Sequence, residues 1–256
     1  MFDSIGFIGA GRVAHIMLGG WQKTGTVLPA VHVFDTSVEA VAALQATFPQ
    51  VQAASLEVVA TQELVFIGLH PPVMNDTLVK IAPHLRADAV LVSLAPKLRL
   101  PALQTQLGGF PRLARLNPNA PSIVAQGFNP IAFSEGLPEE SRAALLSTLA
   151  PLGASPVVAD ELIETCAVIS AMGPTYFWFQ FDTLRELAED FGMSPEFARE
   201  ALRSMLHGAV DTLFASNLPP QQVMDLVPVR PLAAEEDTIR AMLRERVGGI
   251  HAKLNS

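Results

Sequence analysis

Short apolar runs alternate with longer segments of helical period through the first half of the chain. The apolar runs have the length and continuous hydrophobicity of strands that are buried on both faces of a sheet. They are Ser4–Ile8, Val31–Phe34, Leu64–Ile67, Ala89–Ser93 and Arg112–Leu116. The segments between them with a period of about 3.6 residues are Arg12–Lys23, Ser37–Thr47, Val73–Ala82 and Leu100–Leu107. This alternation predicts an α/β fold, a doubly wound parallel sheet with helices on both faces.

The pattern changes in the second half of the chain. The mixed character continues through Asn129–Phe133, Pro138–Leu149 and Ser155–Val158, and every later segment is helical in period. We therefore predict an α/β domain over residues 1–159 and an all-α domain over residues 160–256. A serine, a proline and a glutamate at 194–196 are typical of a helix start and predict a helix over Pro195–Ala215.

A glycine-rich turn follows the first predicted strand and opens the first predicted helix. It reads Gly9-Ala10-Gly11-Arg12-Val13-Ala14, a G-x-G-x-x-A pattern. In such a turn the first glycine permits the tight bend, the second lets the backbone approach a pyrophosphate, and the small last residue allows close packing of helix on strand. The helix N-terminus offers N–H groups to the phosphates. The turn predicts a Rossmann-type dinucleotide site at residues 9–13, and a merely glycine-rich turn is the alternative.

An acid at the end of the second predicted strand indicates which dinucleotide binds. Asp35 lies where a carboxylate can accept hydrogen bonds from the adenosine ribose, and Thr36–Glu39 contains no lysine or arginine for a 2′-phosphate. These features favour NAD, with NADP as the alternative. Asp35 could instead be a surface acid that caps the next helix, a role open equally to Ser37. Arg12 could bind the pyrophosphate or fold across the adenine.

Composition and charge exclude several classes of function. Half of the 256 residues are apolar and 16% are charged, which is typical of a globular protein. The formal charge of −8 leaves no basic surface for nucleic acid. The most apolar run, Cys166–Phe181, is interrupted by Gly173-Pro174 and predicts a buried helix pair or a broken core helix rather than a membrane span. We expect a cytoplasmic protein without a signal peptide. The six histidines and single cysteine have no metal-ligand spacing, so we expect no metal site.

Three motifs resemble pyrroline-5-carboxylate reductase, which reduces a cyclic imine to proline with a nicotinamide cofactor. They are the glycine turn, Arg115–Pro121 (similar to R-x-M-P-N-T-P) and Ser170–Tyr176 (similar to S-G-S-G-P-A-Y). The resemblance runs along most of residues 4–225 and implies proline biosynthesis.

The resemblance also implies roles for residues beyond the glycine turn. Leu69-His70-Pro71 corresponds to a V-K-P turn that lies along the cofactor, with His70 in place of lysine. Ser93–Pro96, which includes Ala95, is similar to the segment that faces the nicotinamide, and Asn119 should border the same end. Asn119 could instead only fix a turn between its flanking residues.

The chain departs from the family in its C-terminal region. The reductases carry a T-S-P-G-G-T-T loop that holds the substrate carboxylate, whereas Pro228–Glu235 here contains no hydroxyl and no glycine. The evidence for this particular imino acid is lost with the loop. Arg230 could bind a carboxylate through two parallel hydrogen bonds, or it could simply face solvent.

The function expected from these features is an NAD(P)H-dependent reductase. It would act on a C=N or C=O bond of a small carboxylate-bearing metabolite, and the groups that could polarise this bond are Thr175, Tyr176, Ser170 and Asn119. A non-catalytic dinucleotide-binding paralogue with a sensor or regulatory role is the alternative, since the substrate loop is missing. A third hypothesis is a reductase that pairs the nicotinamide with a deazaflavin.

The helical half predicts a homodimer. Gly173–Gly192 and Pro195–Ala215 are apolar over more than one face, with four aromatic residues nearly consecutive at 177–181. A single short helical domain could hardly bury them all. The resemblance implies interlocked helical domains, with each cleft built from one chain's Rossmann domain and its partner's helices.

Overall fold

The chain divides into two compact units. The computed structural model describes residues 2–255, apart from the side chains of Pro71 and Pro72. One unit ends at Met172 and takes in the chain again from His251, and the other spans Gly173–Ile250. All strands of the described chain belong to the first unit.

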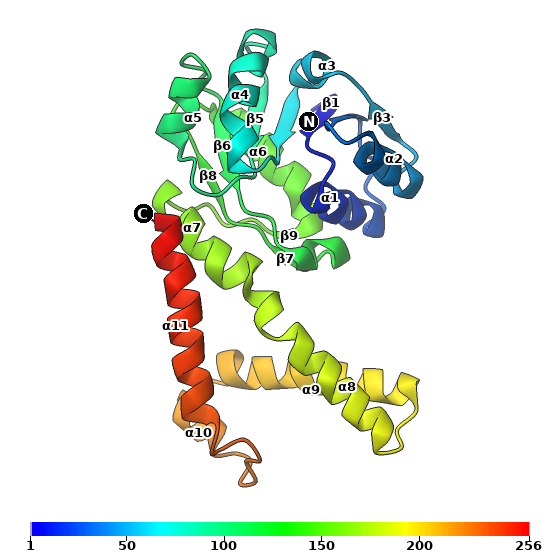
Figure 1. The fold of residues 1–256 in the computed structure, drawn as a ribbon, viewed down its shortest axis with the longest axis vertical. Helices are drawn as coiled ribbons and strands as arrows, with labels where there is room; N and C mark the ends of the chain where they lie inside the picture. The colour runs from blue at the N-terminus through cyan, green and yellow to red at the C-terminus, as the bar shows by residue number, and fades with distance from the viewer. Residues whose placement is uncertain (1, 256) are drawn as a thin grey trace. The chain divides into compact units, whose positions relative to one another are not determined.

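The first unit is built on a seven-stranded sheet in the order β3-β2-β1-β4-β5-β6-β8 (Figure 1). The strands are β1 (Ser4–Ile8), β2 (Ala30–Phe34), β3 (Val51–Ala53), β4 (Leu64–Ile67), β5 (Val90–Ser93), β6 (Leu113–Leu116) and β8 (Ile131–Phe133). All pairings are parallel except that of β8 with β6. Along the chain, β2 and β3 are added on one side of β1, and the strands from β4 onward are added on the other side. The carboxyl end of β1 is therefore a topological switch point, where open α/β sheets bind their ligands.

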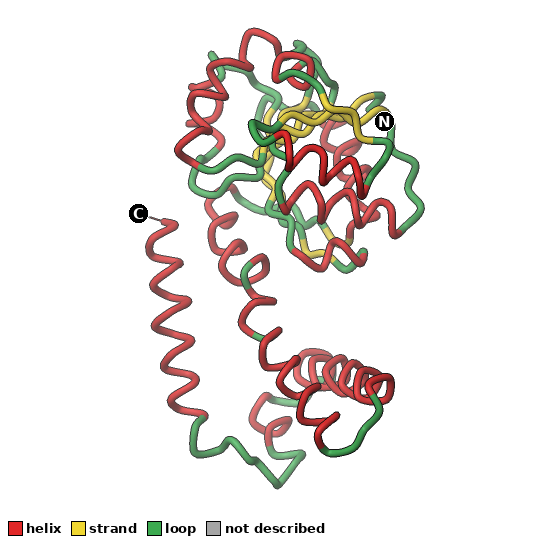
Figure 2. Tube along the Cα trace, turned by 45° about the vertical axis from the view of Figure 1, so that its right-hand side comes forward, coloured by secondary structure: helices red, strands yellow, loops and turns green. Residues whose placement is uncertain are grey.

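Helices cover both faces of this sheet, so the predicted doubly wound fold is confirmed (Figure 2). One face packs against α1 (Arg12–Lys23), α2 (Val38–Thr47) and α6 (Glu139–Leu149). The other packs against α3 (Leu56–Ala60), α4 (Pro71–Ile81) and α5 (Leu100–Gln106). On the first face Trp21 of α1 is fully buried and donates its indole N–H to the carbonyl of Thr148 at 2.8 Å. This bond ties α1 to α6.

The sequence missed the elements that are short or lie at the edges. β3 has three residues, of which two are exposed, and α3 has five, so neither carries a readable period. Ser155–Val158, one of the segments of mixed character, forms no strand: only Val157 forms a bridge there, to Ile131, and Pro156 has no N–H to extend a ladder. A two-stranded sheet lies just before it, formed by β7 (Gly127–Phe128) and β9 (Gly153–Ala154).

The segment from Asp160 to Met172 packs with the first unit. It contains a 3-10 turn (Asp160–Leu162), α7 (Ile163–Cys166) and a π-helical turn (Ala167–Ala171). Ile163 is buried in the core beneath α4 and α5, and Asp160 and Glu164 pair with the buried Arg115 of β6. The compact units consequently divide after Met172 rather than after Ala159. The boundary at 159/160, as a division of function between the two halves, stays a prediction.

The second unit is helical. It contains a 3-10 turn (Gly173–Tyr176), α8 (Trp178–Asp190), α9 (Pro195–Ala215), α10 (Pro220–Met224) and the larger part of α11 (Glu236–Asn255). The helix start at α9 is confirmed, because Ser194 Oγ accepts a hydrogen bond from the Phe197 N–H at 3.2 Å. α8 and α9 pack against each other.

The helical unit has almost no core of its own. Of its described residues, only Gly173 and Ala198 are buried. The run Cys166–Phe181 is broken as predicted, but its aromatic end is not in a core, since Trp178 is 52% exposed and Phe179 is 66% exposed. No helix in the described part of the chain is both long enough and apolar enough to cross a membrane.

Candidate functional site

The glycine turn connects β1 to α1 at the switch point of the sheet. Gly9 has φ +112°, a conformation that side chains rarely adopt, and its N–H donates to the carbonyl of Phe34 at 2.8 Å. A Cβ at Gly9 would lie 2.8 Å from the carbonyl oxygen of Gly68, which follows β4. Gly9 is therefore required so that the turn can fit closely between the ends of β2 and β4.

The next two residues leave room for a ligand at the start of α1. Gly11 is the N-cap residue of α1, is exposed, and would carry a Cβ with no atom within 4 Å. No side chain caps this helix, and its first turn contains no acid. The free N–H groups of the first turn, which includes Arg12 and Val13, are thus available to an anion. An open space over an uncapped helix N-terminus fits a dinucleotide pyrophosphate.

Asp35 is held by two backbone hydrogen bonds at the end of β2. Its Oδ2 accepts from the Ala10 N–H at 2.8 Å, and its Oδ1 accepts from the Ser37 N–H at 2.9 Å. Ser37 itself caps α2, because its Oγ accepts from the Ala40 N–H at 3.1 Å. Asp35 is therefore not the helix cap. A carboxylate has about four lone-pair sites, so Asp35 can still accept from a ribose hydroxyl.

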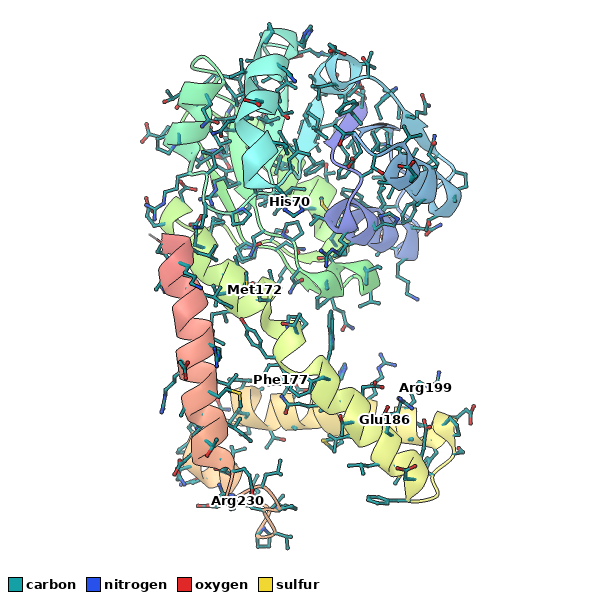
Figure 3. The ribbon with its side chains drawn as sticks, in the orientation of Figure 1. His70, Met172, Phe177, Glu186, Arg199 and Arg230 are labelled. Carbon is teal, nitrogen blue, oxygen red and sulfur yellow. The ribbon has the colours of Figure 1, made fainter. Side chains whose placement is uncertain are left out.

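The turns after β4 and β5 lie at the same edge of the sheet, because parallel strands share one carboxyl end. His70 is the exposed N-cap residue of α4, and its imidazole makes no capping bond (Figure 3). Leu69 is half-buried, and Pro71 is the first residue of α4, with a side chain outside the described residues. Ala95 is buried and follows β5. The structure thus brings the expected cofactor residues to one edge of the sheet.

Asn119 and Ser170 are brought together, and both are occupied by backbone contacts. Asn119 is 6% exposed, its Oδ1 accepts from the Phe128 N–H at 3.0 Å, and its Nδ2 donates to the carbonyl of Ser170 at 3.3 Å. Ser170 Oγ donates to the carbonyl of Cys166 at 2.7 Å. The amide of Asn119 therefore acts here as a cross-link between two segments.

Thr175 and Tyr176 belong to the 3-10 turn that begins the helical unit. Thr175 is exposed and Tyr176 is half-buried. Burial raises the pKa of the Tyr176 phenol above its usual value near 10. The phenol is therefore protonated at neutral pH and can donate a hydrogen bond.

The sequence does not predict the buried ion cluster that lies beneath the turn after β5. Arg115 of β6 is fully buried and pairs with Asp160 at 2.7 Å and with Glu164. The same carboxylates accept backbone N–H groups, Glu164 Oε1 from Lys97 at 3.1 Å and Asp160 Oδ2 from Leu100 at 3.0 Å. The cluster thus fixes the chain just after β5. A charged residue in a strand buried on both faces was the available signal, since such a charge needs a partner.

Arg230, the proposed substitute for the missing loop, is already paired. It lies between α10 and α11 (Figure 3) and forms an ion pair with Glu236, the first residue of α11. This contact raises the pKa of the arginine and lowers the pKa of the carboxyl group. A substrate carboxylate would have to compete with Glu236 for the guanidinium.

A metal centre is not apparent in the part of the chain that the structure describes. No three His, Cys, Asp or Glu side chains gather there in a way that could hold an ion. Burial raises the pKa of the Cys166 thiol, which makes it a poor ligand and nucleophile at neutral pH.

Comparison with known proteins shows which reductases the chain is similar to. The chain matches the family model described as NADP oxidoreductase, coenzyme F420-dependent, over residues 4–97. It is 28% identical to pyrroline-5-carboxylate reductase of Escherichia coli, covering 89% of this chain and 85% of the relative. It is 25% identical to that of Pisum sativum, covering 87% and 81%. The chain is similar to pyrroline-5-carboxylate reductases along most of its length.

Solved structures support the same fold. The Plasmodium falciparum pyrroline carboxylate reductase with NADP bound aligns with a TM-score of 0.84 at 17% identity, covering 99% of this chain and 97% of that chain. The Streptococcus pyogenes 1-pyrroline-5-carboxylate reductase aligns with a TM-score of 0.81 at 17% identity, covering 98% of each chain. Together the comparisons confirm the resemblance, the Rossmann-type fold with a helical C-terminal part, and the class of NAD(P)-dependent oxidoreductases.

Proposed function

We propose that this chain reduces a C=N or C=O bond of a small carboxylate-bearing metabolite with NAD(P)H. Its relatives carry the name pyrroline-5-carboxylate reductase, which describes the reduction of an imine of this kind. The observation that carries the proposal is the open space over Gly11 at the uncapped start of α1. It lies at the switch point of a sheet whose fold and sequence resemble these reductases. The first candidate substrate is a cyclic imino acid. Its reduction would give the protein a role in proline biosynthesis.

The residues that would hold the two halves of the cofactor lie on opposite sides of β1. Gly9, Ala10, Gly11, Arg12 and Val13 would hold the pyrophosphate. Asp35, beside a largely apolar hollow of about 250 Å³ between β2 and α2, would hold the adenosine half. Leu69, His70, Pro71 and Ala95, in the turns after β4 and β5 on the other side of β1, would hold the nicotinamide half.

A nicotinamide held there would supply the hydride for the acceptor carbon. Reduction of an imine also requires a proton on nitrogen, and the protonated phenol of Tyr176 is suited to give or hold one. The hydroxyl of Thr175 would orient the acceptor. Ser170, whose hydroxyl donates to the carbonyl of Cys166, would take part only by accepting a hydrogen bond. Asn119 contributes by holding the Ser170 segment in place through its Nδ2, which makes it a positioning residue.

NADH is the preferred donor in this proposal. Asp35 places a negative charge where NADPH carries its 2′-phosphate, and Thr36–Glu39 supplies no cation. The bound NADP in the Plasmodium falciparum structure belongs to that protein.

The purified protein also allows the two other hypotheses to be tested. The comparisons give no support to a non-catalytic regulatory paralogue. The family model names coenzyme F420, a reason to test whether the purified protein carries a deazaflavin absorbance. A cytoplasmic location stays a prediction from the sequence.

The test is NADH oxidation, followed by nicotinamide absorbance, with pyrroline-5-carboxylate, other cyclic imino acids and 2-oxo acids as acceptors. We expect turnover with at least one carboxylate-bearing imine. Tight NADH binding without oxidation by any acceptor in the series would contradict the proposal.

A homodimer is part of the proposal, and the lack of a core in the helical unit supports it. Several large side chains of α8, its N-cap residue, α9 and the turn between the two helices are exposed: Phe177 (48%), Trp178 (52%), Phe179 (66%), Phe191 (81%), Phe197 (57%) and Phe214 (81%). Soluble monomers rarely expose large apolar patches, and these side chains come from two helices that pack against each other. A second copy would cover these faces with its own helical unit and complete each substrate site.

Light scattering at low micromolar concentration tests the assembly. We expect twice the 27.4 kDa mass of one chain or a larger multiple. A stable, active monomer would refute the interlocked dimer and would require the substrate site to lie within one chain.

A further inference from the structure

Lys97 stands out in the turn after β5 because of its backbone. It has φ +75°, one of only three non-glycine residues of the described chain with positive φ. This conformation is costly for a residue with a Cβ and is natural for glycine. Strained positions of this kind cluster at ligand sites when the surrounding structure holds them in place.

The surroundings of Lys97 hold it firmly. Its N–H donates to Glu164 Oε1 at 3.1 Å, and Glu164 is 1% exposed and paired with the fully buried Arg115. Three residues later, the Leu100 N–H donates to Asp160, the second partner of Arg115, at 3.0 Å. Both ends of the segment are therefore clamped by one buried ion cluster. The backbone conformation of Lys97 is imposed by this cluster.

The side chain of Lys97 is exposed and lines a small hollow. The hollow measures about 150 Å³ and is lined by Ala95–Leu98 together with Met74 and Asn75, from the first two turns of α4. This volume is about five times the roughly 30 Å³ that a water molecule occupies, which suffices for a carboxylate group and its nearest carbons. The hollow lies at the carboxyl edge of the sheet because α4 begins there, directly after β4.

The ammonium group of Lys97 forms no ion pair with another described residue. Among the described residues, Asp160 and Glu164 accept backbone N–H groups of this segment and are both engaged by Arg115, and Lys97 forms no ion pair with either. The position is also on the nicotinamide side of β1, opposite to Asp35 in the strand order. A cation on this held segment, at the expected nicotinamide side of the sheet, suits an anionic acceptor substrate.

We propose that Lys97 is a specificity-determining residue that binds the carboxylate of the acceptor substrate, in place of the glycine-rich loop that this chain lacks. The assignment rests on the proposed reductase function. It explains why a non-glycine residue is kept at a positive φ: the strained backbone directs a cation to this edge of the sheet. The cluster of Arg115, Asp160 and Glu164 is then the support that holds the cation in position.

The test compares an imine with and without its carboxylate. The ratio of kcat/KM for pyrroline-5-carboxylate to that for 1-pyrroline is measured in the full-length protein and in four variants. In Lys97→Met and Lys97→Gly we expect this ratio to fall about 10- to 100-fold, as for loss of one charge-assisted hydrogen bond, with the rate on 1-pyrroline nearly unchanged. Lys97→Arg should keep most of the preference.

Two features of the design guard against a trivial result. Lys97→Gly suits the positive φ, so this variant should unfold at the same temperature as the wild type or higher. Lys80→Met removes an exposed cation from the last turn of α4 and is the matched control, expected to change neither rate nor ratio. NADH affinity, measured by fluorescence titration, should be unchanged in all four variants.

The outcomes separate the two proposals. Absence of turnover with both imines, despite normal NADH binding, overturns the imine reductase function and this assignment with it. Turnover with an unchanged ratio in Lys97→Met overturns the role of Lys97 alone. A loss of NADH affinity of about tenfold or more in Lys97→Met, with the ratio preserved, would assign the ammonium to the cofactor and would equally overturn it.

Discussion

Replacing Arg115 by methionine should show how much of the first unit's stability depends on the buried ion cluster. Arg115 is fully buried, and its partners Asp160 and Glu164 have side chains that are 13% and 1% exposed. Methionine fills a similar volume without a charge, so the variant leaves two carboxylates without their cation. Removing one partner from a buried ion pair typically destabilises a protein by about 3–5 kcal/mol.

The order of effects within the cluster is more diagnostic than any single value. Glu164→Gln keeps an oxygen for the N–H of Lys97 and leaves Arg115 paired with Asp160, so it should cost only about 1–3 kcal/mol. In Arg115→Met/Glu164→Leu no fully buried charge remains, since Asp160 keeps some contact with water. The double variant should therefore be more stable than Arg115→Met alone.

Thermal and urea unfolding, followed by circular dichroism, measure these differences. For a unit of this size, each kcal/mol corresponds to about 2–4 °C in Tm, so Arg115→Met should melt about 6–20 °C below the wild type. The reasoning fails if Arg115→Met lies within about 1 kcal/mol of the wild type, which is the usual range for a surface substitution. It also fails if Glu164→Gln is the more damaging change.

Three further predictions concern the nucleotide site and the thiol. Wild-type protein should bind NADH more tightly than NADPH, and Asp35→Ser should narrow that difference in a fluorescence titration; a wild-type preference for NADPH of about tenfold would refute the role of Asp35. Gly11→Val should abolish dinucleotide binding in a protein with an unchanged circular dichroism spectrum, because a Cβ at this position has no protein atom within 4 Å and the side chain would stand where the pyrophosphate would lie. Undiminished affinity would make the turn purely structural. Because burial raises the pKa of the Cys166 thiol, its alkylation near pH 8 should be slower in the native protein than in urea, and equal rates in both states would contradict this. The stability that the protonated thiol contributes is fully present below its unfolded pKa of about 8.5 and should be lost as pH rises through the folded pKa.

The sequence predicts best those features whose cause lies within a few residues. β1, β4, α1 and α9 were found with their observed bounds because each carries a continuous apolar run, a periodic face or a cap of its own. The caps at Ser37 and Ser194 follow from side chains three residues from the N–H groups that they accept. By contrast, β3 is too short to show a pattern, and its place in the sheet depends on pairing with β2.

The site was predicted in outline, and the missing part is long-range. The glycine turn is a local motif, and the structure bears out its geometry at Gly9 and Gly11. Arg115 and Glu164 are 49 residues apart in the chain, and neither spacing nor composition pairs them. The same holds for Asn119, whose amide looks catalytic in a motif and proves to be bonded to the backbone at Phe128 and Ser170. Which polar groups remain free for chemistry is a property of the folded chain.

The two hydrogen bonds of Asp35 have a consequence for the evolution and engineering of cofactor preference. The carboxylate that would repel a 2′-phosphate also accepts the N–H groups of Ala10 and Ser37, and so it fixes the glycine turn to the end of β2. A change toward NADP that removes the charge therefore also frees one or both of these N–H groups. An asparagine keeps one acceptor oxygen, a serine shortens the reach, and an alanine keeps none. In the proposed function, preference for one nucleotide is thereby coupled to order in the glycine turn, so a successful switch should require a compensating change at Thr36 or Ser37.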